Sequence, residues 1–468
     1  MKIALVEPPW AEVYGSYKSA AKIGNCFPPL GLIYIASVLE KNNHSVKIID
    51  SEIEELDLDG TVNEIRKFKA DIVGITATTP IFHVAKKLAK KIKNELKLPV
   101  IIGGPHITVM PEETMKEEIF DYGVYGEGEE TFLELVNSLE NKKRLDDIMG
   151  IIFRKNGKIV INKPRPFNQK LDDLPIPNRK LLKIDKYLWS VPEKGIVKFT
   201  TIMGSRGCPF DCIFCSQRTM FGTKIRFRSI KNIIEEIEYI TNNLGIKHFQ
   251  FIDDTLTLNK ERLKEMCNLI LQKKLDITWE GWTRANTVDE ETLRLMKRAG
   301  FVRVSFGIES GNPHILKVIK KGVELDDITR AYKLAKKVGL ETRGSVIIGN
   351  PDETKKTLWD TLKFIRKLKY CDQIYLNIAT PYPGTKLYDY AINNEKGMRL
   401  LTRDFSEYRR YGDAVVEVND LSSKDLSRYQ KIGFLMFYLT PGRIYYNLKR
   451  AGFKAGFKNA LAFVRSVF

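Results

Sequence analysis

The stretch Gly204-Ser-Arg-Gly-Cys208-Pro-Phe-Asp-Cys212-Ile-Phe-Cys215 places three of the chain's six cysteines within eight residues. The glycines and the proline in it indicate a loop, and packing alone does not require sulfur at this density. Thiolates favour zinc or iron–sulfur clusters, but structural zinc would need a fourth Cys or His at short spacing, which is missing. A [4Fe–4S] cluster normally has four thiolate ligands. Three would leave one iron open, as a reactive, substrate-binding cluster requires.

The composition limits the possible classes of protein. A chain of 468 residues is long enough for about two to four domains. The cysteines lack paired spacing and no apolar signal segment is present, so we expect a reducing, cytoplasmic location. No apolar run approaches the ~20 residues of a membrane span. The formal net charge of +18 leaves nucleic acid, anionic lipid and acidic small molecules open as partners.

Between residues 1 and 141, apolar runs alternate with amphipathic segments. This alternation predicts an α/β fold with a doubly wound, Rossmann-like parallel sheet. Such a sheet binds ligands beyond the carboxyl ends of its strands, where small residues let the backbone approach a flat ligand closely. The candidate binding residues at these strand ends are Pro8, Pro9, Thr78, Thr79, Gly103, Gly104, Gly126, Glu127 and Gly128.

A hairpin and a linker are expected between residues 142 and 190. Asn156-Gly157 lies between two short apolar runs and predicts a β-hairpin, and the proline-rich stretch after it predicts an extended interdomain linker. From residue 191 to 395 the strand–helix alternation restarts with six units. We therefore expect a partial (β/α)6 barrel, with its chemistry at the carboxyl ends of the strands.

Together these features resemble the cobalamin-dependent radical S-adenosylmethionine (SAM) enzymes. The cysteine loop has that family's spacing, and the stretches 28–34 and 126–129 are similar to its cobalamin-binding domain. The resemblance covers about residues 1 to 395. It implies three cofactors: a [4Fe–4S] cluster, SAM on the open iron, and cobalamin on the N-terminal sheet. The metal ligands and catalytic residues that it implies are Cys208, Cys212 and Cys215.

One departure from the family concerns histidine. The Asp-x-His-x-x-Gly motif, whose histidine binds cobalt in many cobalamin enzymes, is absent around His44, His83 and His106. We therefore expect cobalamin to bind without a histidine from that motif. His83 and His106 are interpreted as packing or hydrogen-bonding residues.

The chemical groups of SAM define further candidates, since its amino group needs acceptors, its ribose a polar partner and its carboxylate a cation. The resemblance supports residues 253–255, Glu309 and Lys321, and the others rest on chemistry and position alone. The candidates are Phe214 for the adenine, Asp253, Asp254 and Thr255 for the amino group, Glu309 and Ser345 for the ribose, and Lys321 and Arg284 for the carboxylate.

Residues 396–468 are expected to form a small helical region. A helix is predicted over 419–438 with Asn419 or Ser422 as its cap, and 441–468 holds six Lys or Arg and no acid among aromatic residues. A helical cap on the barrel is the first interpretation of this basic segment. Peripheral contact with an anionic membrane, or cover for a hydrophobic substrate, is the second; nucleic acid is disfavoured.

The remaining cysteines have weaker signals. Cys267 falls within a predicted helix and Cys371 just before a strand, so both are expected to be buried. Cys26 lies in a loop that could face the cobalamin crevice, and it is a weak candidate for a ligand or redox residue.

The family resemblance implies reductive cleavage of SAM to a 5′-deoxyadenosyl radical, followed by methylation of an unactivated carbon. A small, hydrophobic or lipid-like molecule is the expected substrate, and a flavodoxin- or ferredoxin-type protein the expected electron donor. A cobalamin-dependent cyclase or rearrangement enzyme acting on a tetrapyrrole or terpenoid would have the same motifs. A tRNA methylthiotransferase is disfavoured because only Cys26 precedes residue 208. A non-catalytic cofactor-binding protein is the remaining alternative.

Overall fold

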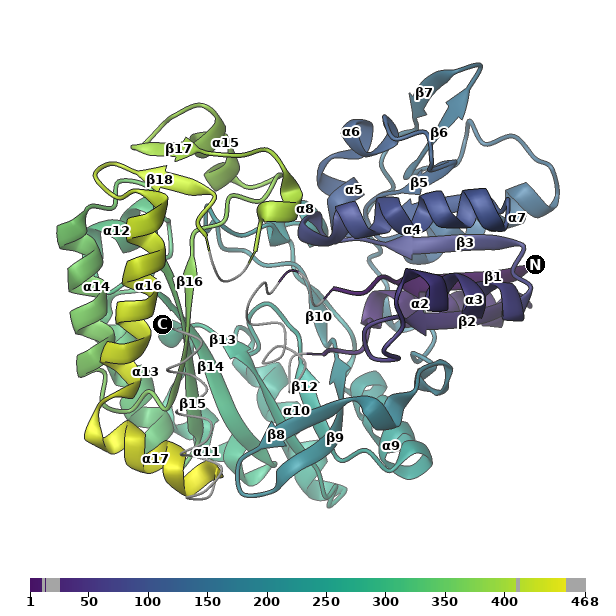
Figure 1. The fold of residues 1–468 in the computed structure, drawn as a ribbon. Coiled ribbons are helices and arrows are strands. Elements are labelled where there is room, and N and C mark those ends of the chain that lie inside the picture. The colour runs from purple at the N-terminus through teal and green to yellow at the C-terminus, as the bar shows by residue number, and fades with distance from the viewer. Residues whose placement is uncertain (11–12, 14–25, 410–412, 452–468) are drawn as a thin grey trace.

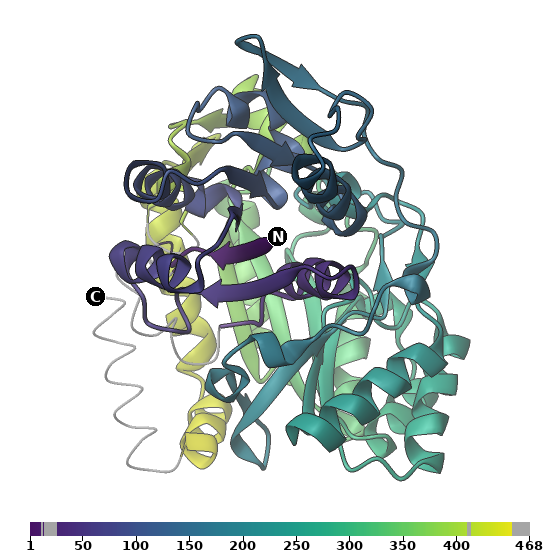
Figure 2. The same cartoon turned by 90° about the vertical axis from the view of Figure 1, so that its right-hand side faces the viewer.

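The computed structural model describes residues 1–10, 13, 26–409 and 413–451, with side chains up to residue 446 in the last helix. Within these residues the chain forms two seven-stranded sheets and two short two-stranded sheets. Figures 1 and 2 show the N-terminal sheet and its helices beside the open end of a curled second sheet, with β10 between them. The predicted α/β class, with a doubly wound sheet followed by a partial barrel, is confirmed.

The N-terminal sheet is parallel through its first five strands and ends in an antiparallel hairpin. Its strands, in spatial order, are β2 (Ser45–Asp50), β1 (Lys2–Glu7), β3 (Ile72–Thr76), β4 (Val100–Gly103), β5 (Tyr122–Val124), β6 (Ile151–Lys155) and β7 (Lys158–Ile161). The helices between them are α2 (Leu30–Lys41), α3 (Leu58–Phe68), α4 (Phe82–Glu95), α5 (Pro105–Val109), α6 (Pro111–Met115) and α7 (Gly128–Glu140). The hairpin expected around Asn156-Gly157 is present, and it extends this sheet.

The second sheet contains six parallel strands and one antiparallel edge strand. Their spatial order is β16 (Gln373–Ile378), β15 (Glu341–Ile348), β14 (Phe301–Glu309), β13 (Thr278–Thr283), β12 (His248–Phe251), β9 (Gly195–Ile202) and β8 (Leu188–Val191). The helices that accompany it are α9 (Ile230–Leu244), α10 (Lys260–Gln272), α11 (Glu290–Arg298), α12 (Pro313–Val318), α13 (Leu325–Lys337) and α14 (Lys355–Lys367).

Helix α9 illustrates why these segments fold as they do. Its isoleucines recur at helical spacing and are buried against the sheet. The Ser229 hydroxyl accepts a hydrogen bond from the Asn232 amide at the N-cap, and Gly245 ends the helix in the left-handed conformation. Helix packing and capping therefore place the next strand, β12, in the core.

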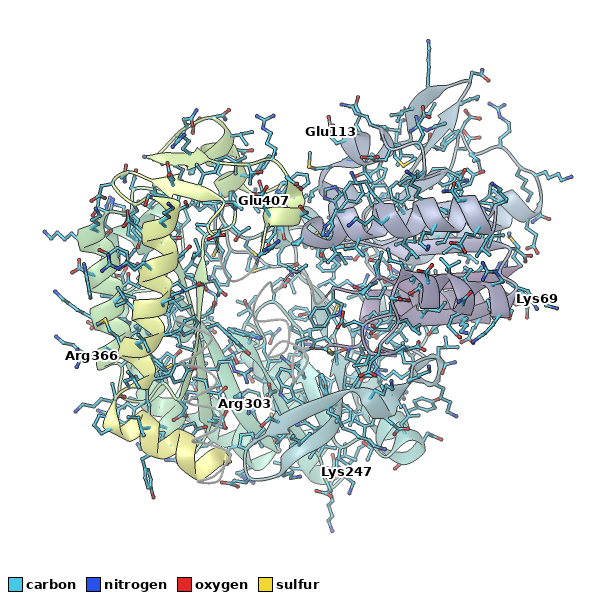
Figure 3. All side chains as sticks on the ribbon, viewed as in Figure 1. Lys69, Glu113, Lys247, Arg303, Arg366 and Glu407 are labelled. Atoms are coloured by element: carbon cyan, nitrogen blue, oxygen red, sulfur yellow. The ribbon has the colours of Figure 1, made fainter. Side chains whose placement is uncertain are left out.

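The amino ends of the barrel strands hold a buried charge network. Arg303, at the start of β14, is fully buried and pairs with Glu280 and with Glu341, whose carboxylate lies 2.6 Å from the Arg303 Nε. Figure 3 shows Arg303 within the barrel, whereas Lys247 and Arg366 lie at its periphery. Arg343 Nη1 lies 3.7 Å from Glu280 Oε1, so two cations and two anions balance at the edge of the sheet opposite the cysteine loop.

The C-terminal region is less helical than predicted. Two strands, β17 (Met398–Leu400) and β18 (Val416–Val418), pair after α15 (Lys386–Ile392). Helix α16 (Ser423–Tyr438) begins after Ser422, which caps it, so the predicted start at Asn419 was wrong. Asn419 instead has a positive φ of 49° in the turn after β18.

The final described helix, α17 (Pro441–Ala451), covers part of the predicted basic segment; residues 452–468 lie outside the described residues. Its Arg443 is buried and donates hydrogen bonds to backbone oxygens of Ile365, Leu368 and Cys371 at the end of α14 and just beyond it. This arginine therefore serves packing. Among the described helices, none combines the length and apolar character of a membrane span.

Candidate active site

The cysteine loop begins where β9 leaves the barrel. Strand β10 (Ser205–Arg206) pairs with β11 (Arg226–Phe227), and α8 (Gln217–Phe221) follows the last cysteine. Gly207 has a φ of +98°, and a Cβ there would lie 2.5 Å from the Lys224 carbonyl oxygen. Only glycine fits this turn, which brings the chain to Cys208.

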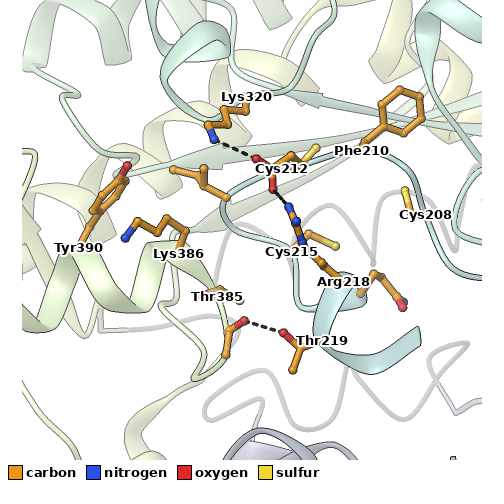
Figure 4. Close-up of a pocket in the computed structure, with 14 residues that line it drawn as sticks. Cys208, Phe210, Cys212, Cys215, Arg218, Thr219, Lys320, Thr385, Lys386 and Tyr390 are labelled. Atoms are coloured by element: carbon orange, nitrogen blue, oxygen red, sulfur yellow. Dashed lines mark hydrogen bonds and ion pairs between the residues drawn. The ribbon is translucent and has the colours of Figure 1, made fainter. Parts of the chain in front are cut away.

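Cys208, Cys212 and Cys215 line one pocket of about 290 Å³, together with Lys320, Lys386 and Tyr390 (Figure 4). Burial raises the pKa of the Cys208 thiol, and raises that of Cys215 to about 11. Both thiols must lose their protons to bind iron, so cluster binding would release protons.

The geometry of the three thiols fits a cluster better than a single ion. No three His, Cys, Asp or Glu among the described residues converge on one ion position. A [4Fe–4S] cluster is compatible with this arrangement, because each of its thiolates binds a different iron and the sulfurs need not share a point. Three soft ligands in one pocket therefore fit the cluster and leave its fourth iron without a local ligand.

Glu309, the last residue of β14, forms a buried ion pair with Lys321, with 2.8 Å between Glu309 Oε1 and Lys321 Nζ. Pairing between β14 and β15 shifts register at Gly307, and Glu309 has a φ of 59°. A Cβ at Gly307 would lie 2.2 Å from Glu309 Oε1, so glycine is required for the pair to fold over the strand. Bulges of this kind redirect side chains near active sites.

Arg284 connects this ion pair with the cysteine loop. Its guanidinium lies 3.6 Å from the centroid of the Phe210 ring, and Nη1 is 3.6 Å from Cys212 Sγ. It also donates to the backbone oxygen of Lys321, while its buried Nε has no hydrogen-bond partner. The structure thus brings together Arg284 and Lys321, the two cations predicted for the SAM carboxylate. Lys321 Nζ lies 6.0 Å from the Phe214 ring centroid.

Asp253 and Asp254 have different surroundings after β12. Asp253 Oδ2 accepts a hydrogen bond of 2.9 Å from the Gly204 amide, and Oδ1 accepts one from the Ser205 hydroxyl. Both oxygens of Asp253 thus hold the cysteine loop. Asp254 has one backbone donor in the loop, the Gly207 amide, and burial, with the charge of Asp253, raises its pKa to about 6. Contact with the SAM amino group stays a prediction, for which Asp254 is the better placed of the two.

Thr255 and Ser345 complete the predicted SAM set. The Thr255 hydroxyl donates to the Asp254 backbone oxygen at 2.9 Å. Ser345 is half-buried on β15 opposite Gly307, and its Oγ accepts a hydrogen bond from Asn377 at 3.4 Å. Both residues lie at the carboxyl end of the barrel sheet, and their contacts with SAM stay predictions.

The predicted cobalamin residues follow β1, β3, β4 and β5, at the carboxyl edge of the N-terminal sheet: Pro8, Pro9, Thr78, Thr79, Gly103, Gly104, Gly126, Glu127 and Gly128. Gly104 has a φ of +92°, and a Cβ there would lie 2.4 Å from Thr76 Oγ1. Their contact with cobalamin stays a prediction. Gly104 is required by close packing against Thr76 and Ala77 of the same sheet edge, and the close approach of a ligand stays a prediction.

Glu127, whose predicted contact with cobalamin stays a prediction, has three protein partners. Its Oε1 lies 2.9 Å from Arg206 Nη1 and 2.8 Å from Arg226 Nη1, and Oε2 accepts from the Asn168 amide at 2.7 Å. Sequence reasoning missed Arg206 and Arg226. Arg206 stands two residues before Cys208, but its partner is remote in the chain, so only the fold identifies it.

The histidines and other cysteines lie where packing was expected. His106 is buried against Phe82, with ring centroids 4.0 Å apart, and one ring nitrogen lies 3.2 Å from Thr79 Oγ1. Burial lowers the pKa of His106 to about 4. Cys267 and Cys371 are buried. Cys26 is half-buried, and its predicted ligand or redox role stays a prediction.

Comparison with known proteins gives the class of this site. Residues 202–365 match the family model of the radical SAM superfamily, and residues 19–136 match that of the B12 binding domain. A protein of Pyrococcus horikoshii named an uncharacterized methyltransferase is 43% identical over 445 residues, covering 94% of this chain and 93% of its own. The chain belongs to the cobalamin-dependent radical SAM family.

Two further relatives are informative for this radical SAM enzyme. The anaerobic magnesium-protoporphyrin IX monomethyl ester cyclase of Rubrivivax gelatinosus is 28% identical, covering 97% of this chain and 85% of its own. The structure of the radical SAM methyltransferase TsrM from Kitasatospora setae, with cobalamin and a [4Fe–4S] cluster bound, has a TM-score of 0.71 at 18% identity, covering 87% of this chain and 84% of that one. The second comparison establishes a shared fold. The cofactors of the family are cobalamin, SAM and a [4Fe–4S] cluster.

Proposed function

We propose that this radical SAM enzyme is a C-methyltransferase that acts on an unactivated carbon of a small, hydrophobic substrate. The observation that carries the proposal is the single pocket lined by Cys208, Cys212 and Cys215, next to the Glu309–Lys321 ion pair. The Pyrococcus horikoshii relative, which matches almost the whole chain, is named a methyltransferase.

The bound cofactors supply the reductive cleavage of SAM and the methyl transfer. The protein holds and orients them. Asp253 fixes the start of the cysteine loop, and the Arg284 guanidinium lies beside Cys212 Sγ. Glu309 and Lys321 offer an acceptor and a donor for the polar groups of SAM.

The proposal includes an acidic electron-donor protein of flavodoxin or ferredoxin type. Arg218, Lys320 and Lys386 line the cysteine pocket, and their side chains are all more than half exposed. Asp211 pairs with two of them, Arg218 and Lys320. A mostly basic rim next to the thiols would attract such a partner electrostatically.

Peripheral membrane contact through the C-terminal segment stays part of the proposal. Ile444 and Tyr445 on α17 are 41% and 67% exposed. Exposed apolar and aromatic side chains on a basic helix suit an anionic lipid surface or a lipid-like substrate. Because Arg443 is buried, it would not contribute to that contact.

A cobalamin-dependent cyclase is the second candidate, since the Rubrivivax gelatinosus relative is named a cyclase. Product mass separates the two reactions, because methylation adds one carbon and two hydrogens, whereas oxidative cyclisation removes hydrogens.

Anaerobic purification with hydroxocobalamin supplied, followed by absorbance spectra and a SAM-cleavage assay, tests the proposal. We expect stoichiometric cobalamin and formation of 5′-deoxyadenosine that Cys212→Ala abolishes. An intact cluster without bound cobalamin would overturn the methyl-transfer mechanism, because the N-terminal sheet would then bind something else.

A further inference from the structure

Four buried charges connect the cysteine loop with the N-terminal sheet. Glu127 and Glu129 lie at the start of α7, just beyond β5, and Arg206 and Arg226 face each other across the β10–β11 pair. Arg206 lies 2.9 Å from Glu127 through Nη1 and 2.5 Å from Glu129 through Nη2. Arg226 Nη1 lies 2.8 Å from Glu127 Oε1 and donates to the Asn168 backbone oxygen. We call this group the Arg206 cluster.

The Arg206 cluster is balanced in charge and shielded from water. The side chains of Arg206, Arg226, Glu127 and Glu129 are 4%, 3%, 7% and 9% exposed. The rings of Tyr34 and Phe221 lie 5.4 and 5.7 Å from the Arg206 guanidinium carbon. Buried ion pairs of this kind add little net stability compared with apolar packing, because desolvation opposes their attraction. Their contribution is to select one register between the parts that they join.

The parts joined here carry the two cofactor sites. Arg206 is separated from Cys208 by one residue, and its neighbour Ser205 is hydrogen-bonded to Asp253. The two glutamates lie at the carboxyl edge of the parallel N-terminal sheet, where ligands of such sheets bind. A movement of that edge would therefore be transmitted to the backbone next to the first cysteine through the bidentate contacts of one guanidinium.

We propose that Arg206 is a positioning residue that fixes the cysteine loop against the N-terminal sheet, so that cobalamin bound at the sheet orders the loop. The inference rests on the proposed function for its ligand. Its basis in the structure is the bridge from Glu127 and Glu129, on one cofactor domain, to Arg206, on the other.

Hydrogen–deuterium exchange of the anaerobic, cluster-loaded protein, with and without hydroxocobalamin, tests the inference. In the wild type we expect hydroxocobalamin to slow hydrogen exchange in peptides that cover residues 126–130 and 204–208. The expected slowing at 204–208 is about tenfold, which corresponds to stabilising one hydrogen bond to a charged group. Absorbance titration measures hydroxocobalamin binding independently of turnover.

The decisive variant is the double substitution Arg206→Gln with Glu129→Gln. It removes one cation and one anion and leaves Glu127 paired with Arg226, so no buried charge loses its only partner. We expect the double variant to bind hydroxocobalamin. Binding should then slow hydrogen exchange at residues 126–130 but not at 204–208. Arg206→Lys keeps the charge but cannot contact both glutamates in a fork, so an intermediate response is expected.

Arg303→Lys is the matched control, because Arg303 is equally buried between two glutamates at the opposite edge of the barrel. It should respond to hydroxocobalamin as the wild type does. A wild type that binds hydroxocobalamin without slower exchange at 204–208, or a double variant that keeps the full response, would overturn the inference alone. A wild type that does not bind hydroxocobalamin would overturn the proposed function together with the inference.

Discussion

Strand β14 carries a charged residue near each end, and the two ends have different surroundings. At the amino end, Arg303 lies between Glu280 and Glu341 in regular strand geometry. At the carboxyl end, Glu309 lies in a bulge with a positive φ, and its partner Lys321 comes from the segment after α12. At the amino end, an ion-paired charged residue thus holds the register between neighbouring strands. At the carboxyl end, an ion-paired charged residue lies in strained backbone geometry near the cysteine loop.

The largest expected effect is at the carboxyl end. Cys212→Ser removes one of three cluster ligands, and we expect formation of 5′-deoxyadenosine to fall at least about a thousandfold, to background, because the cofactor carries the chemistry. Cys267→Ser is the matched control. It is a buried cysteine in α10 outside the pocket, so iron content and visible absorbance should stay normal. Normal cleavage by Cys212→Ser would contradict the cluster assignment.

Substitutions at the amino end of β14 should affect the stability of the fold rather than the formation of 5′-deoxyadenosine. Arg303→Gln removes the nearest cation of the buried Glu280 and Glu341 carboxylates, and leaves Arg343 at 3.7 Å from Glu280 alone. We expect it to lower the free energy of unfolding by about 3–5 kcal/mol in urea titrations. Lys247→Gln, which breaks an exposed pair with Asp276, should cost less than about 1 kcal/mol. Equal effects of the two variants would show that the buried network does not hold the barrel edge.

A pH dependence of stability is expected from Glu353, just beyond β15. Burial raises its pKa to about 7, and its Oε2 accepts from the Gly349 and Asn350 amides. Between the unfolded pKa near 4.5 and the folded value, the native state binds the additional proton. The contribution of Glu353 to stability is therefore largest below pH 4.5 and is lost as the pH rises through 7, by up to about 3 kcal/mol. Glu353→Gln should remove this part of the pH dependence, as measured by urea titration across the range. If the free energy of unfolding of Glu353→Gln depends on pH as that of the wild type does, the prediction is wrong.

The smallest effect is expected from Glu309→Gln, which keeps the shape of the residue but weakens its charge-assisted bonds. We expect SAM to bind about tenfold more weakly, as measured by equilibrium dialysis of the cluster-loaded protein. Glu341→Gln at the amino end is the control and should leave SAM affinity unchanged. A larger loss of SAM affinity in Glu341→Gln than in Glu309→Gln would contradict a SAM site at the carboxyl end of the barrel.

The sequence predicted what depends on local pattern. The loop of Cys208, Cys212 and Cys215 could be predicted because the three candidate ligands lie close together in the sequence. Ser422 could be predicted as a helix cap. Apolar runs predicted most strands of both sheets, since buried parallel strands are apolar throughout, but β5 and β8 were not predicted. Strands β17 and β18 were missed because three residues are too short for periodicity.

Partners across the fold could not be predicted. Glu127 stands at a strand end, which indicated a ligand contact, and the structure adds two partners 79 and 99 residues away on β10 and β11. Asp253 is predicted to contact SAM, and the structure adds hydrogen bonds to its oxygens from Gly204 and Ser205. The position of a residue at a strand end thus predicts the region of the fold in which it lies. Its hydrogen-bond and ion-pair partners depend on how distant segments pack together.

The burial of Arg443 also limits how far the chain can be shortened in the laboratory. Its guanidinium donates to carbonyl oxygens at the end of α14 and to that of Cys371. A truncation that ends before Thr440 would remove these donors and expose the helix end, so soluble expression should suffer. A truncation placed after Ala451 keeps these donors, together with Ile444 and Tyr445 of the proposed lipid contact, and is the safer boundary for a shorter chain.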